Sequence, residues 1–323
     1  MKALRVEALD AGVVIRDIPR PVPGPGEVLV RIAAAGLNFA DLLMLRGQYQ
    51  DMPVPPFTLG LELAGTVDAL GPDVDGPAPG TRVAVFASHG ALAEYGTFDA
   101  GRCLPIPDTM PFEEAAAFQV AYGTSHIALD RRAGLKPGET LLVLGAGGGV
   151  GLTAVEIGAL MGARVIACAR GRAKLEAAAA AAAHVLIDSA TADIREAVKA
   201  EGGADVVFDA VGGDQFRAAL RATKPEGRIL LIGFASGTVP EIPANHLLVK
   251  NVSVIGLYWG GYLTFAPDAL TGSLATLLEW YREGRLHPHV SHVLPLEAAA
   301  EGLELLRSRK ATGKVVVSTG AAP

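Results

Sequence analysis

The sequence has few of the features of secreted, nucleic-acid-binding or membrane-spanning proteins. Its 2 cysteines in 323 residues, Cys103 and Cys168, cannot form a disulfide framework and favour a reducing, cytoplasmic location. Lysine and arginine never occur more than two in a row, and the formal net charge is −6. A nucleic-acid binder would carry a basic face, so we expect no nucleic-acid partner.

Long apolar runs are also absent. The first residues, MKALRVEALDAG, lack the uninterrupted apolar core of a signal peptide. The most apolar central stretch is interrupted by Glu176 and His184, which makes it too short to span a bilayer. We therefore expect a cytoplasmic protein without a membrane segment.

Apolar and turn-forming residues are abundant. Apolar residues make up 50% of the chain and charged residues 19%, which excludes disorder for most of it, and 323 residues favour two domains over one. Short strand-like runs at 27–35 and 81–87 lie between clusters of proline and glycine, such as 19–26 and 71–80. This pattern predicts a small, barrel-like β domain within the first 120 residues.

From about residue 112 the pattern changes to apolar strands that alternate with helices. The expected helices cover 113–129, 150–161, 174–183, 194–200 and 215–220, and the expected strands cover 141–144, 164–169, 185–187, 206–208 and 229–232. The alternation predicts an α/β domain with a doubly wound parallel sheet that is covered on both faces.

The alternation of strands and helices stops after about residue 255. A helix is expected at 274–283, and strands are expected at 287–293 and 314–318. Because two strands and a helix cannot bury a core alone, we expect this segment to rejoin the first domain.

The strongest local signal is the segment LLVLGAGGGVG, residues 141–151. It follows a buried strand, opens a helix and has glycines at the spacing Gly145-x-x-Gly148-x-x-Gly151. Small residues let the backbone turn sharply and approach a diphosphate, and the helix N-terminus offers free N–H groups. The segment therefore predicts a dinucleotide site that includes Gly149 and Val150.

The residues after the next strand indicate which dinucleotide is bound. An NAD site usually has an acidic residue at the end of that strand, to hold the ribose hydroxyls. Here Arg170, Arg172 and Lys174 follow the strand 164–169, and no acidic residue occurs before Glu176. Cations there would bind a 2′-phosphate, so we expect NADP(H) as the cofactor.

Two further groups of residues are open to more than one interpretation. Phe234 and Ser236 follow the strand 229–232, at the edge of the sheet where ligands bind, and we expect backbone contacts with the cofactor there. His287, His289 and His292 have the spacing of a possible metal site. On a strand, however, His292 would point away from the other two, so we expect no metal.

Eight motifs in this order resemble the zinc-free quinone oxidoreductase (zeta-crystallin-like) branch of the medium-chain dehydrogenase/reductase superfamily. The motifs are PGPGEVLVRI (23–32), GLNFADLLMLRGQY (36–49), LGLELAGTV (59–67), AAAFQVAYGTSHIAL (115–129), GAGGGVG (145–151), DAVGG (209–213), LLIGFASG (230–237) and ATGKVVV (311–317). The resemblance implies a GroES-like β-rich catalytic domain, 1–120 and 256–323, around a Rossmann domain, 121–255. It also implies a homodimer, often formed by extension of the Rossmann sheet.

The resemblance also bears on zinc. Zinc-dependent relatives hold catalytic zinc with a cysteine and a histidine, whereas this chain has Asn38 and Leu61 at the corresponding positions. Asparagine is a poor zinc ligand and leucine is none, so we expect no metal in the active site. Without a Lewis acid, acceptors that need little activation are favoured.

The same resemblance implies roles for individual residues. Asn38 and Tyr49 are expected to face the nicotinamide as the catalytic residues. Asn38 would donate to a substrate carbonyl or hold the nicotinamide ribose, and Tyr49 would line the cleft or donate a proton. Asp41 is expected to be a helix cap or ribose partner. Thr124 is expected to pack beside the nicotinamide. Lys314 is expected to reach the cofactor phosphates.

The function expected from the sequence is hydride transfer from NADPH to a quinone or an α,β-unsaturated carbonyl without zinc. Two alternatives stay open at this point. One is reduction of an enoyl thioester of the acrylyl type, and the other is a non-catalytic NADPH-binding protein.

Overall fold

The structure, a computed structural model, describes residues 1–320 and separates the chain into two compact units. Unit 1 comprises Met1–Val120 and Pro288–Pro323, and unit 2 comprises Ala121–His287. Residues 256–287, which the sequence assigned to the first domain, belong to unit 2. They do so because α10 (Pro267–Arg282) bonds to α3 (Gln119–His126) through Ser273 and His126, whose Oγ and Nδ1 atoms lie 2.8 Å apart.

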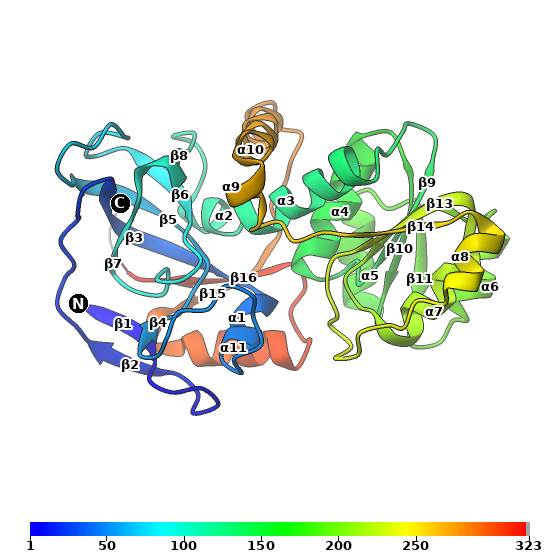
Figure 1. Ribbon diagram of the computed structural model, residues 1–323, viewed down its shortest axis with the longest axis horizontal. Coiled ribbons are helices and arrows are strands. Elements are labelled where there is room, and N and C mark those ends of the chain that lie inside the picture. Colours follow the sequence, from blue (N-terminus) through cyan, green and yellow to red (C-terminus); the bar gives the residue numbers. More distant parts are fainter. Residues whose placement is uncertain (321–323) are drawn as a thin grey trace. The chain divides into compact units, whose positions relative to one another are not determined.

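Unit 1 is β-rich. Its elements are β1 (Lys2–Val6), β2 (Val14–Asp17), β3 (Glu27–Leu37), α1 (Phe39–Met44), β4 (Phe57–Thr58), β5 (Glu62–Leu70), β6 (Arg82–Phe86), β7 (Tyr95–Asp99), η1 (Ala100–Arg102), β8 (Cys103–Pro105), α2 (Phe112–Ala116), β15 (Val290–Pro295), η3 (Leu296–Ala298), α11 (Ala299–Arg307) and β16 (Lys314–Ser318). The long strand β3 pairs with β5, β7 and β16, which makes it the centre of the larger sheet (Figure 1). Its inward side chains, such as Val30 and Ile32, are fully buried.

The pairing of β16 with β3 joins the two ends of the chain within unit 1. Val316 lies opposite Gly36, and Val315 lies opposite Leu37. This register brings Lys314, at the start of β16, beside the end of β3.

Unit 2 alternates strands and helices. Its elements are α3 (Gln119–His126, which begins at the boundary), η2 (Ile127–Arg132, a π-helical turn), β9 (Thr140–Leu144), α4 (Gly149–Leu160), β10 (Arg164–Ala169), α5 (Arg172–Ala180), β11 (Val185–Asp188), α6 (Ile194–Ala200), β12 (Ala204–Asp209), α7 (Gly213–Ala222), β13 (Thr223–Leu231), α8 (Ala244–Lys250), β14 (Ser253–Gly256), α9 (Tyr262–Phe265) and α10. The strands form one parallel sheet in the order β11-β10-β9-β12-β13-β14.

This strand order is that of a Rossmann fold. Counted from β9, the order reads 3-2-1-4-5-6, and it reverses between β9 and β12. In open parallel sheets the ligand crevice lies at the carboxyl ends of the strands at this reversal. The turn after β9 and the turn after β12 are therefore the places where a ligand of unit 2 is expected.

Three local expectations differ from the structure. The helix expected at 113–129 is divided into α2, α3 and the π-helical turn. The strand β14 and the helix α8 were not expected. Of the three histidines near 290, only His292 lies in a strand, because β15 begins at Val290.

Glu156 of α4 fixes the chain at both ends of unit 2. Its carboxylate accepts a hydrogen bond from the Tyr122 hydroxyl at 2.5 Å and another from the His287 N–H at 2.7 Å. The second and the last residue of unit 2 are therefore attached to the same helix.

No helix within residues 1–320 is long and apolar enough to cross a membrane.

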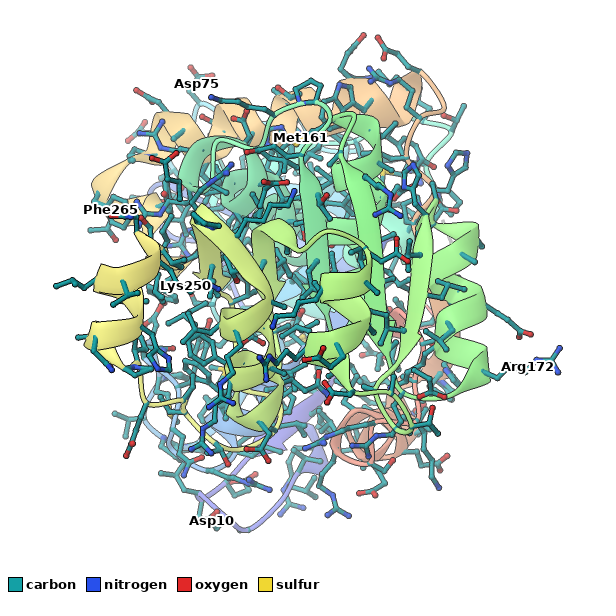
Figure 2. The ribbon with its side chains drawn as sticks, turned by 90° about the vertical axis from the view of Figure 1, so that its right-hand side faces the viewer. Asp10, Asp75, Met161, Arg172, Lys250 and Phe265 are labelled. Carbon is teal, nitrogen blue, oxygen red and sulfur yellow. The ribbon has the colours of Figure 1, made fainter. Side chains whose placement is uncertain are left out.

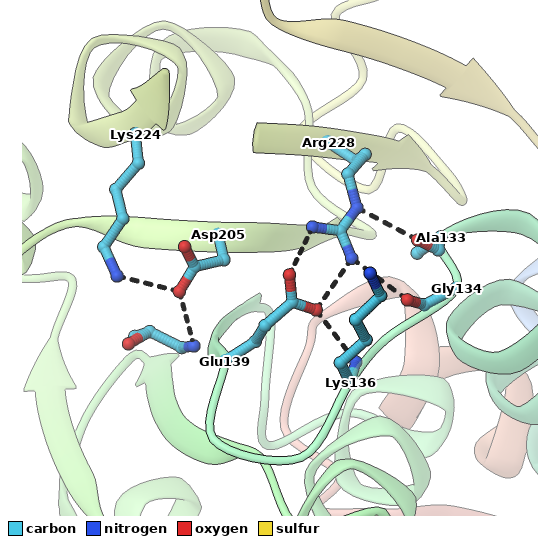
Figure 3. A network of polar contacts seen from close by, with 8 residues as sticks. Ala133, Gly134, Lys136, Glu139, Asp205, Lys224 and Arg228 are labelled. Carbon is cyan, nitrogen blue, oxygen red and sulfur yellow. Dashed lines mark hydrogen bonds and ion pairs between the residues drawn. The ribbon is translucent and has the colours of Figure 1, made fainter. Parts of the chain in front are cut away.

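A polar network fixes the loop before β9 to the amino end of the sheet (Figure 3). The Arg228 guanidinium donates to both carboxylate oxygens of Glu139, at 2.7 and 2.8 Å, and to the carbonyl oxygens of Ala133 and Gly134. Hydrogen bonds from Arg228 and from the Lys136 N–H hold the pKa of Glu139 below its usual value. Bidentate, half-buried pairs of this kind contribute more than exposed pairs do.

Replacement of Arg228 by methionine should lower the free energy of unfolding by about 2–3 kcal/mol, because Glu139 would lose its partner in a half-buried position. The matched control is Arg217→Met, which removes an exposed pair with Asp214 on α7 and should cost no more than about 0.5 kcal/mol. Urea unfolding followed by circular dichroism measures both. Equal losses in the two variants would contradict a special contribution from Arg228.

Candidate functional site

The turn after β9 has the geometry that its glycines predicted. Gly145 has φ +75°, and its N–H donates to the Cys168 carbonyl oxygen of β10 at 3.0 Å. A Cβ on Gly151 would lie 2.1 Å from the Gly145 carbonyl oxygen. Any side chain at position 151 would therefore clash with this oxygen, and only glycine fits there. Strand and helix therefore approach each other at a distance that excludes any side chain.

The first turn of α4 presents its backbone N–H groups without a side-chain cap. Gly148 is the N-cap residue and has no side chain to accept from Gly149, Val150 or Gly151. The first N–H groups of a helix have no acceptor within the helix and carry its positive dipole end. The turn is half-buried from Gly148 to Val150. These features fit a diphosphate, so the residues present match a dinucleotide.

The three cations after β10 differ in their surroundings. Arg170 is exposed directly after the strand, and Lys174 packs its side chain against the glycine turn, where a Cβ on Gly147 would lie 2.4 Å from Lys174 Cβ. Arg172 points away from the ribbon (Figure 2), is 92% exposed and pairs with Glu176 at 2.6 Å. Glu176 therefore holds the Arg172 guanidinium in solvent, away from the glycine turn.

An acidic side chain near these cations belongs to the next strand. Asp188, the last residue of β11, accepts hydrogen bonds from the N–H groups of Gly171 and Ala190 at 3.1 and 2.9 Å. Those two bonds, with the charge of Arg170, hold its pKa below the usual value. Asp188 therefore fixes the turn that carries Arg170.

The loop after β13 packs on the turn after β12. The N–H of Ser236 donates to the Val211 carbonyl oxygen at 2.9 Å, and a Cβ on Gly212 would lie 3.1 Å from the Phe234 ring. Phe234 and Ser236 are half-buried at the carboxyl edge of the sheet, where the sequence placed them. Their contact with a cofactor stays a prediction.

Asp209, at the end of β12, is a further polar residue of this edge, and it begins the motif DAVGG. It is fully buried, and its Oδ1 accepts from the N–H groups of Val211 and Gly212 at 2.8 and 2.9 Å. Burial raises the pKa of this carboxyl, against the effect of the two N–H groups. Asp209 shapes the glycine-rich turn from which α7 begins.

Thr124 lies on α3 and is buried, with 9% of its surface exposed. The adjacent Ser125 hydroxyl lies 3.0 Å from the Val150 carbonyl oxygen and 2.8 Å from Thr153 Oγ1, both in α4. These bonds fix α3 against the first turn of α4. The expected contact between Thr124 and the nicotinamide stays a prediction.

In unit 1, the half-buried Asn38 forms a polar cluster with the buried Glu62 and Lys314. Lys314 Nζ lies 2.8 Å from Asn38 Oδ1 and 2.7 Å from Glu62 Oε1, and Asn38 Nδ2 lies 2.9 Å from Glu62 Oε1. The side chains of Lys314 and Glu62 are only 7% and 1% exposed. The sequence did not predict a role for Glu62, because no local pattern connects it to Asn38 or Lys314.

The expected role of Lys314 does not agree with its surroundings. Its third proton goes to the Leu37 carbonyl oxygen at 2.9 Å, so all three ammonium protons have acceptors within unit 1. A contact with cofactor phosphates would require these bonds to be broken. Tyr49 is half-buried in the segment after α1, and its expected place beside the nicotinamide stays a prediction.

Asp41 is the helix cap that the sequence offered as one of its roles. Its Oδ2 accepts from the Asn38 N–H at 2.7 Å, at the start of α1. Burial raises the pKa of Asp41 to about 7, although the Asn38 N–H and the Lys314 charge lower it. The carboxyl is therefore partly protonated near neutral pH.

Comparison with known proteins gives matches over nearly the whole chain. The family models described as "Zinc-binding dehydrogenase" and "Alcohol dehydrogenase GroES-like domain" match residues 149–277 and 24–108. The chain is similar to "Quinone oxidoreductase-like protein 2" of Bos taurus, with 41% identity over 310 residues that cover 94% of this chain and 88% of the relative.

Solved structures are similar over the whole length as well. The quinone oxidoreductase of Thermus thermophilus, described also in its complex with NADPH, has a TM-score of 0.87 and 34% identity, and the match covers 98% of this chain and 100% of that one. A structure described as an NAD-dependent alcohol dehydrogenase has a TM-score of 0.88 and 33% identity, with 99% and 100% covered.

The zinc in one family description does not fit the residues of this chain. Leu61, at one ligand position, is a buried leucine, and Asn38 Oδ1, at the other, accepts a proton from the Lys314 ammonium. That ammonium would repel a divalent cation. Within residues 1–320, no group of three or more histidine, cysteine, aspartate or glutamate side chains could hold a metal ion.

Replacement of Gly151 by alanine should force α4 away from the turn, since the new Cβ would meet backbone atoms of Gly145 at 2.1 and 2.8 Å. We expect a loss of about 1–3 kcal/mol in the free energy of unfolding and weaker dinucleotide binding. Gly148→Ala is the control for stability, because its Cβ would meet only the Gly145 oxygen, at 3.5 Å. Similar unfolding temperatures for both variants, without cofactor, would contradict the close contact.

Asp41 should make the protein less stable as the pH rises from about 4 to about 7. The unfolded chain releases this proton near pH 4, whereas the folded chain holds it until about pH 7, so the free energy of unfolding falls over this range, by up to about 4 kcal/mol. Asp41→Asn should remove this component, and the exposed carboxyl of Asp214 provides the control Asp214→Asn. Urea unfolding at a series of pH values measures it, and a pH profile of Asp41→Asn parallel to wild type would disprove the assignment.

Proposed function

The chain belongs to the zinc-free quinone oxidoreductase branch of the medium-chain dehydrogenase/reductase superfamily, and we propose that it transfers hydride from NADPH to a quinone or an α,β-unsaturated carbonyl. The observation that carries the proposal is the uncapped first turn of α4, set against β9 by Gly145 and Gly151. The similarity of the whole chain to a quinone oxidoreductase whose structure is described with NADPH supports the same function.

Unit 2 supplies the binding of the dinucleotide. The N–H groups of Gly149, Val150 and Gly151 would hold the diphosphate, and Phe234, Ser236 and Thr124 would line the rest of the cofactor. Bound NADPH supplies the hydride. Everything else that the protein contributes is orientation, exclusion of water and hydrogen bonds.

The preference for NADPH would depend on Arg170 and Lys174. Arg170 lies directly after β10, and Lys174 lies over the glycine turn, so both are near the end of the strand where the ribose of a dinucleotide is held. The exposed Arg172, paired with Glu176, would contribute little. Of the three cations that the sequence suggested for the 2′-phosphate, we therefore propose Arg170 and Lys174.

In the proposed reaction the acceptor is activated by hydrogen bonds and not by a metal. Without a Lewis acid, the oxyanion that forms on the acceptor is stabilised only by hydrogen bonds, which suits quinones and conjugated carbonyls. Tyr49 would line the site, and water would deliver the proton. Asn38 would position the cofactor, which is the one of its two expected roles that its hydrogen bonds favour.

A homodimer is part of the proposal. The outer strand β14 ends the parallel sheet at one edge, and α8 beside it exposes Leu248 and Val249, at 78% and 76%. Exposed strand edges and apolar side chains of this kind favour pairing with a second chain. The buried thiols of Cys103 and Cys168 are consistent with a reducing, cytoplasmic location.

Consumption of NADPH with a panel of quinones, enones and enoyl-CoA esters tests the function. Turnover with quinones or enones is expected. Turnover only with enoyl-CoA esters would assign the acceptor to thioesters, and NADPH binding without turnover on any acceptor would contradict an enzymatic role.

Replacement of Arg170 by alanine should weaken NADPH binding by about 10- to 100-fold and leave NADH binding within about threefold, because a charged hydrogen bond contributes about 1.5–3 kcal/mol. Arg172→Ala is the matched control and should change neither by more than about threefold. Titration of cofactor fluorescence measures all four affinities. Equal losses for NADPH and NADH in Arg170→Ala would show that Arg170 does not bind the 2′-phosphate.

A further inference from the structure

Three consecutive polar residues of α3 are buried. They are Thr124, Ser125 and His126, and none exposes more than 9% of its surface. Successive residues of an α-helix point about 100° apart, so the three side chains cannot serve the same neighbour. Because buried polar groups are normally hydrogen-bonded, the partner of each side chain indicates what that side chain does.

Two of the three side chains attach α3 to other helices of unit 2. The Ser125 hydroxyl lies 3.0 Å from the Val150 carbonyl oxygen of α4. His126 Nδ1 lies 2.8 Å from Ser273 Oγ of α10. Ser125 and His126 therefore serve the packing of α3 within unit 2.

Thr124 differs from its two neighbours, because its hydroxyl has no hydrogen-bond partner within residues 1–320. A threonine in a helix can bond to its own backbone, as Thr153 does with the Val150 carbonyl oxygen at 3.0 Å. Thr124 makes no such bond. Its hydroxyl is therefore available to a ligand, and in the proposed function Thr124 lines the cofactor.

The contact between α3 and α4 is a pair of buried hydroxyls. Ser125 Oγ and Thr153 Oγ1 lie 2.8 Å apart, so one hydroxyl donates its proton to the other. Each hydroxyl has one proton, so one proton is left for a carbonyl oxygen. The two candidates are Val150, 3.0 Å from both hydroxyls, and Ala121 of α3, 3.1 Å from Thr153. Whichever carbonyl is used, the bond between the hydroxyls joins the two helices.

The two helices would meet different parts of one ligand. The N–H groups in the first turn of α4 would hold the diphosphate, and Thr124 would lie beside the nicotinamide. A single ribose joins these two parts of the dinucleotide, so its length limits how far α3 can lie from α4. A contact that fixes this distance would therefore act on the nicotinamide end of the ligand.

We propose that Ser125 and Thr153 are positioning residues, whose hydroxyl pair holds α3 at the distance from α4 at which Thr124 reaches the nicotinamide. Both side chains are buried, so neither contacts the cofactor itself. This assignment rests on the proposed function, since it requires the dinucleotide.

Two ligands separate the ends of the dinucleotide in a test of this assignment. NADPH contains the nicotinamide, whereas 2′-phospho-ADP-ribose has the diphosphate and the 2′-phosphate without it. The variants are Ser125→Ala, Thr153→Val and the double variant. The measurements are the Kd of both ligands by isothermal titration calorimetry, kcat at saturating NADPH and the unfolding temperature without ligand.

The double variant should raise the Kd for NADPH by about 3- to 10-fold and lower kcat by about 10-fold, because the nicotinamide is no longer held in position. Its Kd for 2′-phospho-ADP-ribose should stay within about twofold of wild type, since the first turn of α4 is retained. Its unfolding temperature should change by less than about 3 °C, because both partners are removed together.

Each single variant should change either Kd by less than about threefold, because the remaining hydroxyl can still bond across the helices. In Ser125→Ala the bond from Thr153 to Ala121 is left, and in Thr153→Val the bond from Ser125 to Val150 is left. A full effect in one single variant would assign the contact to that residue alone and contradict the pair.

Two further variants are controls. Thr153→Ser keeps the hydroxyl and should stay within about twofold of wild type for both ligands. Thr223→Val removes a buried hydroxyl that donates to the Ala219 carbonyl oxygen at 2.8 Å. Thr223 is the first residue of β13, at the edge of the sheet opposite the ligand crevice, so its loss should change neither Kd by more than about twofold.

Two results for the double variant would overturn the assignment. An equal rise in Kd for both ligands would mean that the pair only supports the turn that holds the diphosphate. An unchanged Kd for NADPH with an unchanged kcat would mean that α3 is held without the pair. If the wild-type protein binds neither ligand, the proposed function itself fails, which separates the two questions.

The assignment stays testable if the double variant fails to fold. Ser125→Cys combined with Thr153→Val fills the same space and leaves only a weak thiol donor. The same difference between the two ligands is expected from this variant, and equal effects on both would contradict the assignment.

Discussion

The arrangement of unit 2 depends on the contact between Gly151 of α4 and the carbonyl group of Gly145. With a Cβ at position 151, this carbonyl oxygen would lie only 2.1 Å away, so the helix could not start so near the end of β9. The contact leaves the first N–H groups of α4 at the carboxyl end of the sheet, where the strand order reverses. The same turn donates from Gly145 and Ala146 to the Cys168 carbonyl oxygen, which fixes the end of β10 and with it Arg170.

The fold of unit 2 was predictable from the sequence to the extent that its strands are buried on both faces. Strands such as β9 and β10 are almost wholly apolar, and that pattern marks a parallel sheet. The edge strand β14 was not predicted, because it has only four residues and none of them is fully buried. The division between α2 and α3 was not predicted, because residues 115–118 include no residue type that commonly ends a helix. In the structure, Ala117 nevertheless leaves helical geometry, with ψ 0°. Tertiary packing, not local preference, decides both.

The site was predictable in part, and for different reasons at different residues. The glycine turn carries its own geometry in its spacing. Arg172 was included with Arg170 because sequence position alone does not give the direction of a side chain, yet its partner Glu176 at i+4 was a signal for a solvent-exposed helical pair. Glu62 could not be found, because it meets Lys314 across 252 residues through the pairing of β16 with β3 and of β3 with β5.

In the polar cluster of unit 1, the positive charge comes from a lysine of the protein and not from a metal ion. Glu62 alone would be a buried, uncompensated carboxylate, and the Lys314 ammonium 2.7 Å away supplies the positive charge that balances it. Burial raises the pKa of the neighbouring Asp41 to about 7, so at neutral pH the cluster does not carry a full second negative charge. The ammonium lies beside Asn38, but its three protons are already bound to acceptors, and it cannot polarise a carbonyl as a Lewis acid would. The cluster therefore balances its own charge without supplying a Lewis acid, which agrees with the proposed acceptors, since these take hydride without one.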